Sequence, residues 1–342
     1  MKALFHRATT RPNGTAFIYD GVVWTYSDLL AGAEQLSRAF LAHGVRPGDR
    51  VVLHMPNTPE MAVALYACFC VGAIACPTNL RFKTAELREI FQRLHPALYL
   101  GDEQLYAYVE TIEPEILAAE KRFVTGPSGA YNGALPWSAL LVDGASRRRL
   151  PPEPDKDAAA VLLTTSGTTG QPKFVTHTPA TLSAIAEAYA HADLSAAQTV
   201  LNASPMVHAA GLSAFLASVN FGAPRVMVER FDADAVLDQI ELHECTWMLG
   251  LPFMYDALVE GQRKRPRNVD SLRYCRCAGD VCPIQLQVQF EATFGTPLCN
   301  YWGATEAVGS QSHGLRPGPV TRIAPGAEVR LVDDDGRDVS RG

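Results

Sequence analysis

The sequence has few charged residues and no long uninterrupted apolar segment. Lysine, arginine, aspartate and glutamate make up 19% of the 342 residues, and the formal net charge is −6. This composition lacks the basic surface that nucleic-acid binding requires, and we interpret the basic runs 147–149 and 263–265 as solvated. The most apolar segment, residues 61–76, is shorter than the roughly 20 residues of a membrane-spanning helix. We therefore expect neither a nucleic-acid partner nor a membrane span.

The sequence also lacks cysteine pairs at metal-binding spacing and lacks an apolar leader. None of the eight cysteines forms a Cys-x-x-Cys pair, and three of them lie within residues 61–76. This pattern argues against a zinc site and favours buried, reduced thiols. His6, Arg7 and Arg11 interrupt the segment where a signal peptide would be continuously apolar. We therefore expect a cytoplasmic protein.

Strand and helix signals alternate along the early part of the chain. Short strand-like segments flank the pair 20–21, Asp-Gly, which predicts a hairpin. Residues 25–41 form an amphipathic run, and residues 50–54 an apolar strand. Thr58 as N-cap and Pro59 at the first helical position predict a helix over the apolar segment. We expect an α/β fold of two stacked α/β subdomains with mostly parallel sheets, because the chain is long enough for more than one folding unit.

The segment LLTTSGTTGQPKFVTHT, residues 162–178, combines seven hydroxyl side chains with two glycines and Lys173. It overlaps the end of the apolar run 158–163, which is typical of a buried strand of a parallel sheet. Ligands bind at the carboxyl ends of such strands, and glycines let backbone N–H groups approach an anion. Ordinary surface loops share this composition, and the spacing differs from the GxxxxGK[ST] nucleotide loop. The density of the pattern nevertheless favours a phosphate site, to which Lys173 would add charge.

Within this segment, TTSGTTGQPK closely resembles the phosphate-binding signature of the adenylate-forming enzymes. That family includes acyl- and aryl-CoA ligases, luciferases and amino-acid adenylation domains, and its loop covers the β- and γ-phosphates of ATP during acyl-AMP formation. The resemblance implies that ATP is bound by Thr165, Ser166, Gly167, Thr168, Thr169, Gly170 and Lys173, and that Lys173 is also catalytic. The family usually has glycine after the lysine, where this chain has Phe174. We expect the ring either to stiffen the loop or to pack inward.

A second segment, PMVHAAG at residues 205–211, fits another signature of the same family. The resemblance places His208 beside the acyl pocket and ATP, as a catalytic and pocket residue, and Gly211 in the substrate pocket. A lone histidine is more often structural than catalytic. The small side chains of residues 209–217 would leave room for a substrate, although tight helix packing predicts the same composition.

A third pair of segments, CAGDVCP and NYWGATEA, completes the match. A strand end with Gly279 lets a flat ring lie against the backbone, and the resemblance implies that Ala278, Gly279 and Asp280 meet adenine. For the WGATE signature it implies that Trp302 stacks on adenine, Gly303 lies at the nucleotide, Ala304 lies at the substrate pocket, Thr305 binds the α-phosphate and Glu306 coordinates Mg²⁺. Thr305 and Glu306 would both be catalytic. Mg²⁺ prefers carboxylate and phosphate oxygens, and a reacting phosphate needs preplaced donors and cations.

Tyr301 occupies a position where many family members have glycine beside the acyl pocket. Its ring would shorten that pocket, which favours a short or aromatic carboxylic acid over a long-chain fatty acid. Alternatively, the ring packs in the core, as tyrosines commonly do when the hydroxyl finds a partner.

The order of these signatures resembles the large N-terminal domain of the family. We expect a first α/β part at residues 1–157, the ATP and acid site at residues 158–306, and the start of a truncated β-barrel subdomain at residues 307–342. The Thr-Gly-Asp signature and the small C-terminal domain of the family are not in the sequence, so the resemblance implies little activity for residues 1–342 alone.

The leading hypothesis is an ATP-dependent carboxylate–CoA ligase that uses ATP, Mg²⁺ and coenzyme A with a small carboxylic acid. One alternative is a catalytically disabled binding module of the same fold, which Phe174 favours. Another is an acyl-AMP ligase or an amino-acid adenylation domain that feeds a carrier protein. The latter would need an acidic partner for the substrate ammonium in the second signature, where the sequence has His208.

Overall fold

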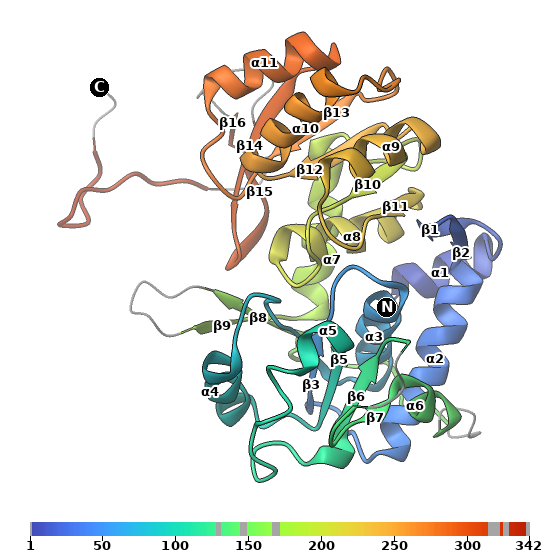
Figure 1. The fold of residues 1–342 in the computed structure, drawn as a ribbon. Coiled ribbons are helices and arrows are strands. Elements are labelled where there is room, and N and C mark those ends of the chain that lie inside the picture. Colours follow the sequence, from blue (N-terminus) through green and yellow to red (C-terminus); the bar gives the residue numbers. More distant parts are fainter. Residues whose placement is uncertain are drawn as a thin grey trace.

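The computed structural model describes residues 2–127, 131–143, 149–165, 172–313, 322–323 and 328–339. Two sheets, each flanked by helices, give the mostly parallel α/β architecture that the sequence predicts (Figure 1). Strands from residues 1–157 and from residues 158–306 contribute to both sheets, so the sheets do not coincide with the predicted parts. The division at residue 157 stays a prediction.

The first sheet has seven strands in the order β7-β6-β5-β3-β4-β8-β9. Its strands are β3 (Arg50–His54), β4 (Ile74–Pro77), β5 (Leu98–Asp102), β6 (Arg122–Thr125), β7 (Leu135–Pro136), β8 (Val161–Thr165) and β9 (Lys173–His177). Its helical segments are α2 (Tyr26–Ala42), α3 (Pro59–Val71), α4 (Thr84–Leu94), α5 (Glu103–Tyr106), η1 (Ala119–Lys121) and α6 (Trp137–Asp143). All neighbouring strands run parallel except β8 and β9, which form an antiparallel edge.

The second sheet has nine strands in the order β16-β15-β14-β13-β12-β10-β11-β1-β2. Its strands are β1 (Thr15–Tyr19), β2 (Val22–Thr25), β10 (Val200–Asn202), β11 (Arg225–Met227), β12 (Trp247–Gly250), β13 (Tyr274–Cys277), β14 (Leu298–Ala304), β15 (Ala307–His313) and β16 (Arg322–Ile323). Its helical segments are α1 (Lys2–Thr10), α7 (Pro179–Ala188), η2 (Tyr189–Ala192), α8 (Ala209–Phe221), α9 (Ala233–His243), α10 (Pro252–Lys264) and α11 (Ile284–Phe294).

Local sequence signals account for several of these elements. Asp20 and Gly21 have positive φ angles and join β1 to β2 in the expected hairpin. Thr58 caps α3 by accepting a hydrogen bond from the Met61 backbone N–H at 3.3 Å, with Pro59 in the first turn. The predicted start of the apolar helix is therefore confirmed.

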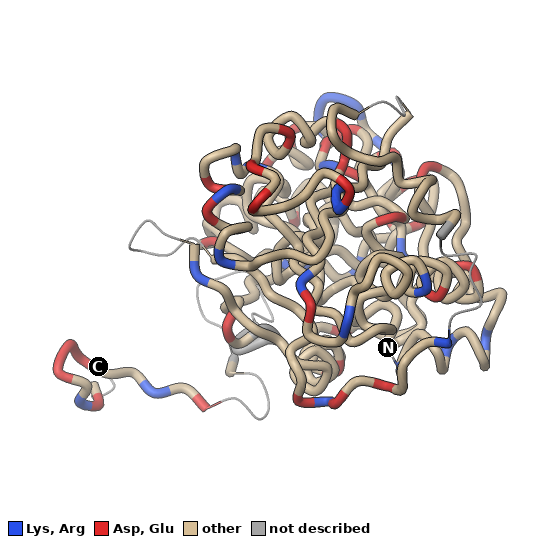
Figure 2. The backbone as a smooth tube through the Cα atoms, turned by 90° about the horizontal axis from the view of Figure 1, so that it is seen from below, with Lys and Arg blue, Asp and Glu red and all other residues tan. Residues whose placement is uncertain are grey.

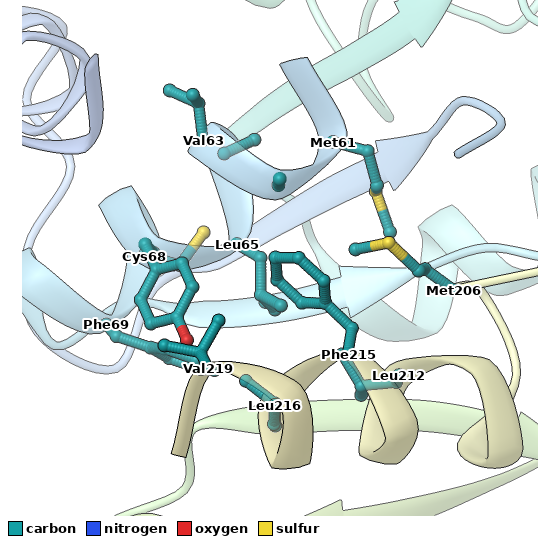
Figure 3. Close-up of a cluster of buried hydrophobic side chains, with 14 of the residues drawn as sticks. Met61, Val63, Leu65, Cys68, Phe69, Met206, Leu212, Phe215, Leu216 and Val219 are labelled. Atoms are coloured by element: carbon teal, nitrogen blue, oxygen red, sulfur yellow. The ribbon is translucent and has the colours of Figure 1, made fainter. Parts of the chain in front are cut away.

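The largest apolar core lies where α3 meets α8. Figure 3 shows Leu65 and Phe69 of α3 close to Phe215 and Val219 of α8, and these side chains are buried. Both helices are apolar on nearly all sides because each is enclosed by other elements. The core thus joins the two sheets through a helix pair.

Other expectations concern the whole chain. No helix among the described residues is long and apolar enough to cross a membrane. All eight cysteines are buried free thiols, and burial raises the pKa of Cys76 to about 12. Figure 2 shows Lys and Arg interspersed with Asp and Glu over the whole fold. A turn lies at Asp333–Gly336, where Gly336 has a φ of +79°. Among the described residues, 307–339 form no closed barrel.

Candidate functional site

The phosphate-loop segment leaves the carboxyl end of β8 and returns as β9. Thr165 and Lys173 face each other in the antiparallel ladder, so the two strands fix both ends of the loop. The Lys173 side chain is exposed. The loop itself lies outside the described residues, and with it Ser166, Gly167, Thr168, Thr169 and Gly170.

Phe174 packs inward. Its ring is half-buried against the apolar cluster beside α4, and the Arg93 guanidinium carbon lies 4.5 Å from the ring centroid. Arg93 also donates from Nη1 to the Pro172 carbonyl oxygen at 2.6 Å. These contacts anchor the start of β9 to α4, on the side of the strand away from Lys173.

The third signature forms a hairpin, with Thr305 and Glu306 at the turn between β14 and β15. Successive residues of a strand point to opposite faces. Accordingly, Tyr301 is only 6% exposed, whereas the next residue, Trp302, is 57% exposed. Gly303 and Glu306 are exposed, and Ala304 and Thr305 are half-buried. The aromatic face and the carboxylate are therefore both accessible to a ligand.

Tyr301 packs in the core. Its ring centroid lies 6.4 Å from that of Tyr189, whose hydroxyl hydrogen-bonds the Ser213 hydroxyl on α8 at 2.7 Å. Because α8 carries the small residues assigned to the substrate pocket, the tyrosine borders the helix that would bound the acid. A Tyr301 ring that packs in the core can therefore also shorten the predicted acyl pocket, because both lie beside α8.

The segment Ala278–Asp280 turns sharply at the carboxyl end of β13. The Ala278 backbone N–H donates to the Gly250 carbonyl oxygen at 3.0 Å, and Gly279 has a φ of +88°. Asp280 is exposed and accepts a hydrogen bond from the Val281 backbone N–H at 2.7 Å. A positive φ favours glycine, which explains the residue at the centre of this turn.

His208 is the N-cap residue of α8, and its side chain is exposed and makes no capping hydrogen bond. Desolvation by the surrounding protein lowers the pKa of His208, and the positive charge of Arg81 lowers it further. Gly211 lies against backbone, because a Cβ there would come within 2.2 Å of the Pro205 carbonyl oxygen. Its role in a substrate pocket stays a prediction.

Two buried polar residues that join these segments have no local sequence signal. Asn57 donates from Nδ2 to the carbonyl oxygens of Ser204 and Val228 at 3.1 and 3.2 Å, and its Oδ1 accepts from the Met206 backbone N–H at 2.8 Å. A buried amide with all these partners is well satisfied. It fixes the loop that leads to His208.

His177 is the second of these residues. Its Nε2 lies 2.9 Å from the Thr305 carbonyl oxygen, so β9 of the first sheet is bonded to the hairpin turn of the second. Desolvation lowers the pKa of His177, and the bond to Thr305 opposes that shift. Both His177 and Asn57 could be found only through contacts between residues more than 120 positions apart, since local sequence carries no signal for such pairs.

The motif segments converge because of the sheet topology. His208, Ala278 and Thr305 follow the carboxyl ends of β10, β13 and β14, which belong to the run of parallel strands in the second sheet. Ligands of α/β sheets bind at this edge. The His177 bond joins the end of β9, which pairs with the amino end of β8, to the turn at Thr305.

Two further observations bear on the position and chemistry of the site. A surface depression of about 350 Å³ lies between α10 and α11, is lined by residues such as Asp256, Glu260 and Gln289, and contains none of the motif residues. Among the described residues, no three His, Cys, Asp or Glu side chains gather to hold a metal. A single exposed carboxylate such as Glu306 nevertheless fits Mg²⁺, which commonly keeps one or two protein ligands and takes the rest from water and phosphate.

The family model described as AMP-binding enzyme matches residues 4–342. The chain belongs to the AMP-binding enzyme family. Family membership confirms the resemblance that the signatures indicated.

Relatives and solved structures support this assignment. A feruloyl-CoA synthase of an Amycolatopsis species is 31% identical over 304 residues, covering 88% of this chain and 58% of its own length. A medium-chain fatty-acid–CoA ligase of Escherichia coli is 28% identical over 348 residues, covering 94% and 60%. This AMP-binding chain therefore spans less than two thirds of these relatives.

Two solved structures share its fold. An anthranilate CoA ligase in complex with anthranoyl-AMP has a TM-score of 0.93 at 22% identity, covering 100% of this chain and 67% of its own. The O-succinylbenzoate coenzyme A synthetase of Bacillus subtilis, in complex with ATP and magnesium ion, has a TM-score of 0.83 at 26% identity, covering 99% and 68%. These similarities confirm the expected α/β fold.

Proposed function

We propose that this chain is the ATP- and acid-binding part of a carboxylate–CoA ligase that uses Mg²⁺. The observation that carries the proposal is the bond from His177, at the end of the strand that follows the phosphate loop, to the turn at Thr305, which lies at the same sheet edge as the Ala278–Asp280 turn. The relatives named above supply the reaction class, since they are CoA ligases or synthases.

In the proposed first step, a carboxylate oxygen of the acid attacks the α-phosphorus of ATP. The bond from that phosphorus to the oxygen bridging to the β-phosphate breaks, and pyrophosphate leaves with the electron pair. In the second step, the thiol sulfur of coenzyme A attacks the acyl carbon, the thiol proton is lost, and AMP leaves. Both steps need charge stabilisation at phosphate oxygens.

The residues of the site have matching proposed roles. The exposed Lys173 offsets charge on the β- and γ-phosphates, and the Thr305 hydroxyl binds an α-phosphate oxygen. Trp302 offers an exposed face on which adenine stacks. Bound Mg²⁺ would supply positive charge to the phosphates, and Glu306 is the residue that would hold it.

A short or aromatic acid is the proposed substrate class. Tyr301 fills space beside Tyr189 and α8 with a phenol ring, and a long acyl chain would clash with that ring. Feruloyl and anthranoyl groups, named for two of the similar proteins, are aromatic, whereas the relative from Escherichia coli is named for a medium-chain fatty acid.

Two rival functions give different outcomes in the same assays. The binding-module hypothesis is based on Phe174 and on the absence of the C-terminal segment from residues 1–342, and the ring of Phe174 packs toward Arg93 on α4. A carrier-protein acceptor differs from coenzyme A only in what attacks the acyl-AMP.

The buried thiols fit the cytoplasmic location that we propose.

Pyrophosphate release by a full-length protein that includes the small C-terminal domain, measured with ATP, Mg²⁺ and a panel of acids from acetate through benzoate to palmitate, tests the proposal. We expect release to depend on the acid and to be fastest with a short or aromatic member. Thioester formation with coenzyme A, compared with a pantetheinylated carrier protein, then identifies the acceptor. Binding of ATP without acid-dependent pyrophosphate release would favour the binding module instead.

A further inference from the structure

We propose that His177 is a positioning residue whose Nε2–H holds the Thr305–Glu306 turn at a fixed position relative to β9, the strand that follows the phosphate loop. The inference rests on the proposed function, because it concerns the position of Thr305 and Glu306, the proposed phosphate and Mg²⁺ ligands, relative to β9. It assigns a task to a side chain that does not itself touch the substrate.

His177 lies on a strand that is paired along its whole length. Lys173 begins β9 and His177 ends it, and both pair with β8, opposite Thr165 and Val161 respectively. The Ala160 backbone N–H also donates to the His177 carbonyl oxygen at 2.8 Å. The histidine backbone is therefore fixed relative to both ends of the phosphate loop.

The His177 side chain donates the hydrogen bond to Thr305. The Thr305 carbonyl oxygen can only accept, so Nε2 must carry the proton that bridges the 2.9 Å distance. His177 is 3% exposed, so bulk water competes poorly for this acceptor. The constraint acts on the turn backbone and leaves the Thr305 hydroxyl and the exposed Glu306 carboxylate available for a ligand.

The bond between His177 and Thr305 joins the two sheets. β9 belongs to the first sheet and the turn to the second, and the two are 128 residues apart in sequence. A second connection exists, because α7 begins just after His177 and contacts β15. His177 therefore sets the turn locally, whereas α7 holds the hairpin as a whole, and the test must separate these contributions.

The experiment measures ATP affinity by calorimetry with and without Mg²⁺, for the parent chain and for three variants. His177→Phe keeps an aromatic ring of similar size and removes the donor. His177→Gln retains a donor at about the reach of Nε2. His243→Gln, a half-buried histidine at the end of α9, is the matched control.

We expect Mg²⁺ to tighten ATP binding by the parent, and His177→Phe to reduce that tightening about tenfold, the loss typical of one buried hydrogen bond. His177→Gln should recover most of it, and His243→Gln should match the parent. If His177→Phe does not fold, His177→Asn, whose amide is too short to reach Thr305, takes its place against His177→Gln.

The outcomes separate the two proposals. A folded His177→Phe or His177→Asn protein with the parental Mg²⁺ effect would overturn the positioning role alone. Equal loss in His177→Gln and His177→Phe would also overturn it, because a donor at the correct reach would then be irrelevant. A parent chain whose ATP binding ignores Mg²⁺ would overturn the proposed function, and the inference with it.

Discussion

Lys173 and Phe174 are neighbours on β9, and their side chains point to opposite sides of the strand. One is exposed at the phosphate loop, and the other is packed against α4. A substitution at either position should therefore affect a different property, although the residues are adjacent.

In a full-length protein that includes the small C-terminal domain, Lys173→Ala should reduce acid-dependent pyrophosphate release at least tenfold while changing stability by less than about 0.5 kcal/mol, because an exposed lysine contributes little to folding. Pyrophosphate assays and urea denaturation of the same preparations provide the two measurements. Unchanged release would remove Lys173 from the proposed mechanism.

Phe174→Ala should instead lower the free energy of unfolding by about 1 to 3 kcal/mol, since a half-buried ring and its contact with Arg93 are lost. Val142→Ala, at a position that is 73% exposed, is the control and should cost much less. Equal unfolding midpoints for the two variants would contradict the packing of Phe174.

His54 should make stability depend on pH. It is fully buried, and desolvation lowers its pKa from 6.5 to about 4. Between these values the unfolded chain binds more protons than the folded one, so stability is complete above pH 6.5 and falls as the pH drops toward 4, by up to about 3 kcal/mol. Urea denaturation at pH 7.5 and pH 5 measures the loss, which should shrink in His54→Gln. A parental loss in that variant would assign the effect to other groups.

At the scale of elements, the loop before α8 depends on contacts with the segment before α3. Asn57→Ala removes three hydrogen bonds and leaves buried backbone groups of the loop unpaired. We expect a loss of about 2 to 4 kcal/mol in unfolding free energy. Thr58→Ser retains the adjacent cap and is the control. A loss below about 0.5 kcal/mol would mean that water replaces the amide without cost.

Elements formed by local chemistry were the predictable part of the fold. The Asp20-Gly21 hairpin and the Thr58 cap depend on neighbours in sequence, and both are confirmed. The pairing of β1 with β11 and of β4 with β8 depends on chain crossings, and no local pattern specifies it. For the same reason the motif residues could be named from sequence, whereas His177 and Asn57 could not.

At the scale of the molecule, one apolar core reaches from Leu4 to Tyr301 and includes both α3 and α8. Although the length suggests several folding units, this shared core predicts that the two sheets unfold together. Phe215→Ala should lower stability by about 3 to 5 kcal/mol and shift the signals of Trp137, beside the first sheet, and Trp247, in the second, equally. Fluorescence of single-tryptophan variants provides the measurement. Separate transitions for the two tryptophans would show independent units.

The hairpin β1–β2 has a further consequence during synthesis. It pairs with β11, which lies about 200 residues later in the chain. At about 5 to 20 residues per second, a nascent chain leaves this hairpin without its partner for on the order of 10 to 40 s. Val22 and Val23 are exposed even in the finished fold, and a lone two-stranded hairpin is marginally stable. The nascent polypeptide should therefore engage ribosome-associated chaperones early and release them only once β11 has emerged from the exit tunnel.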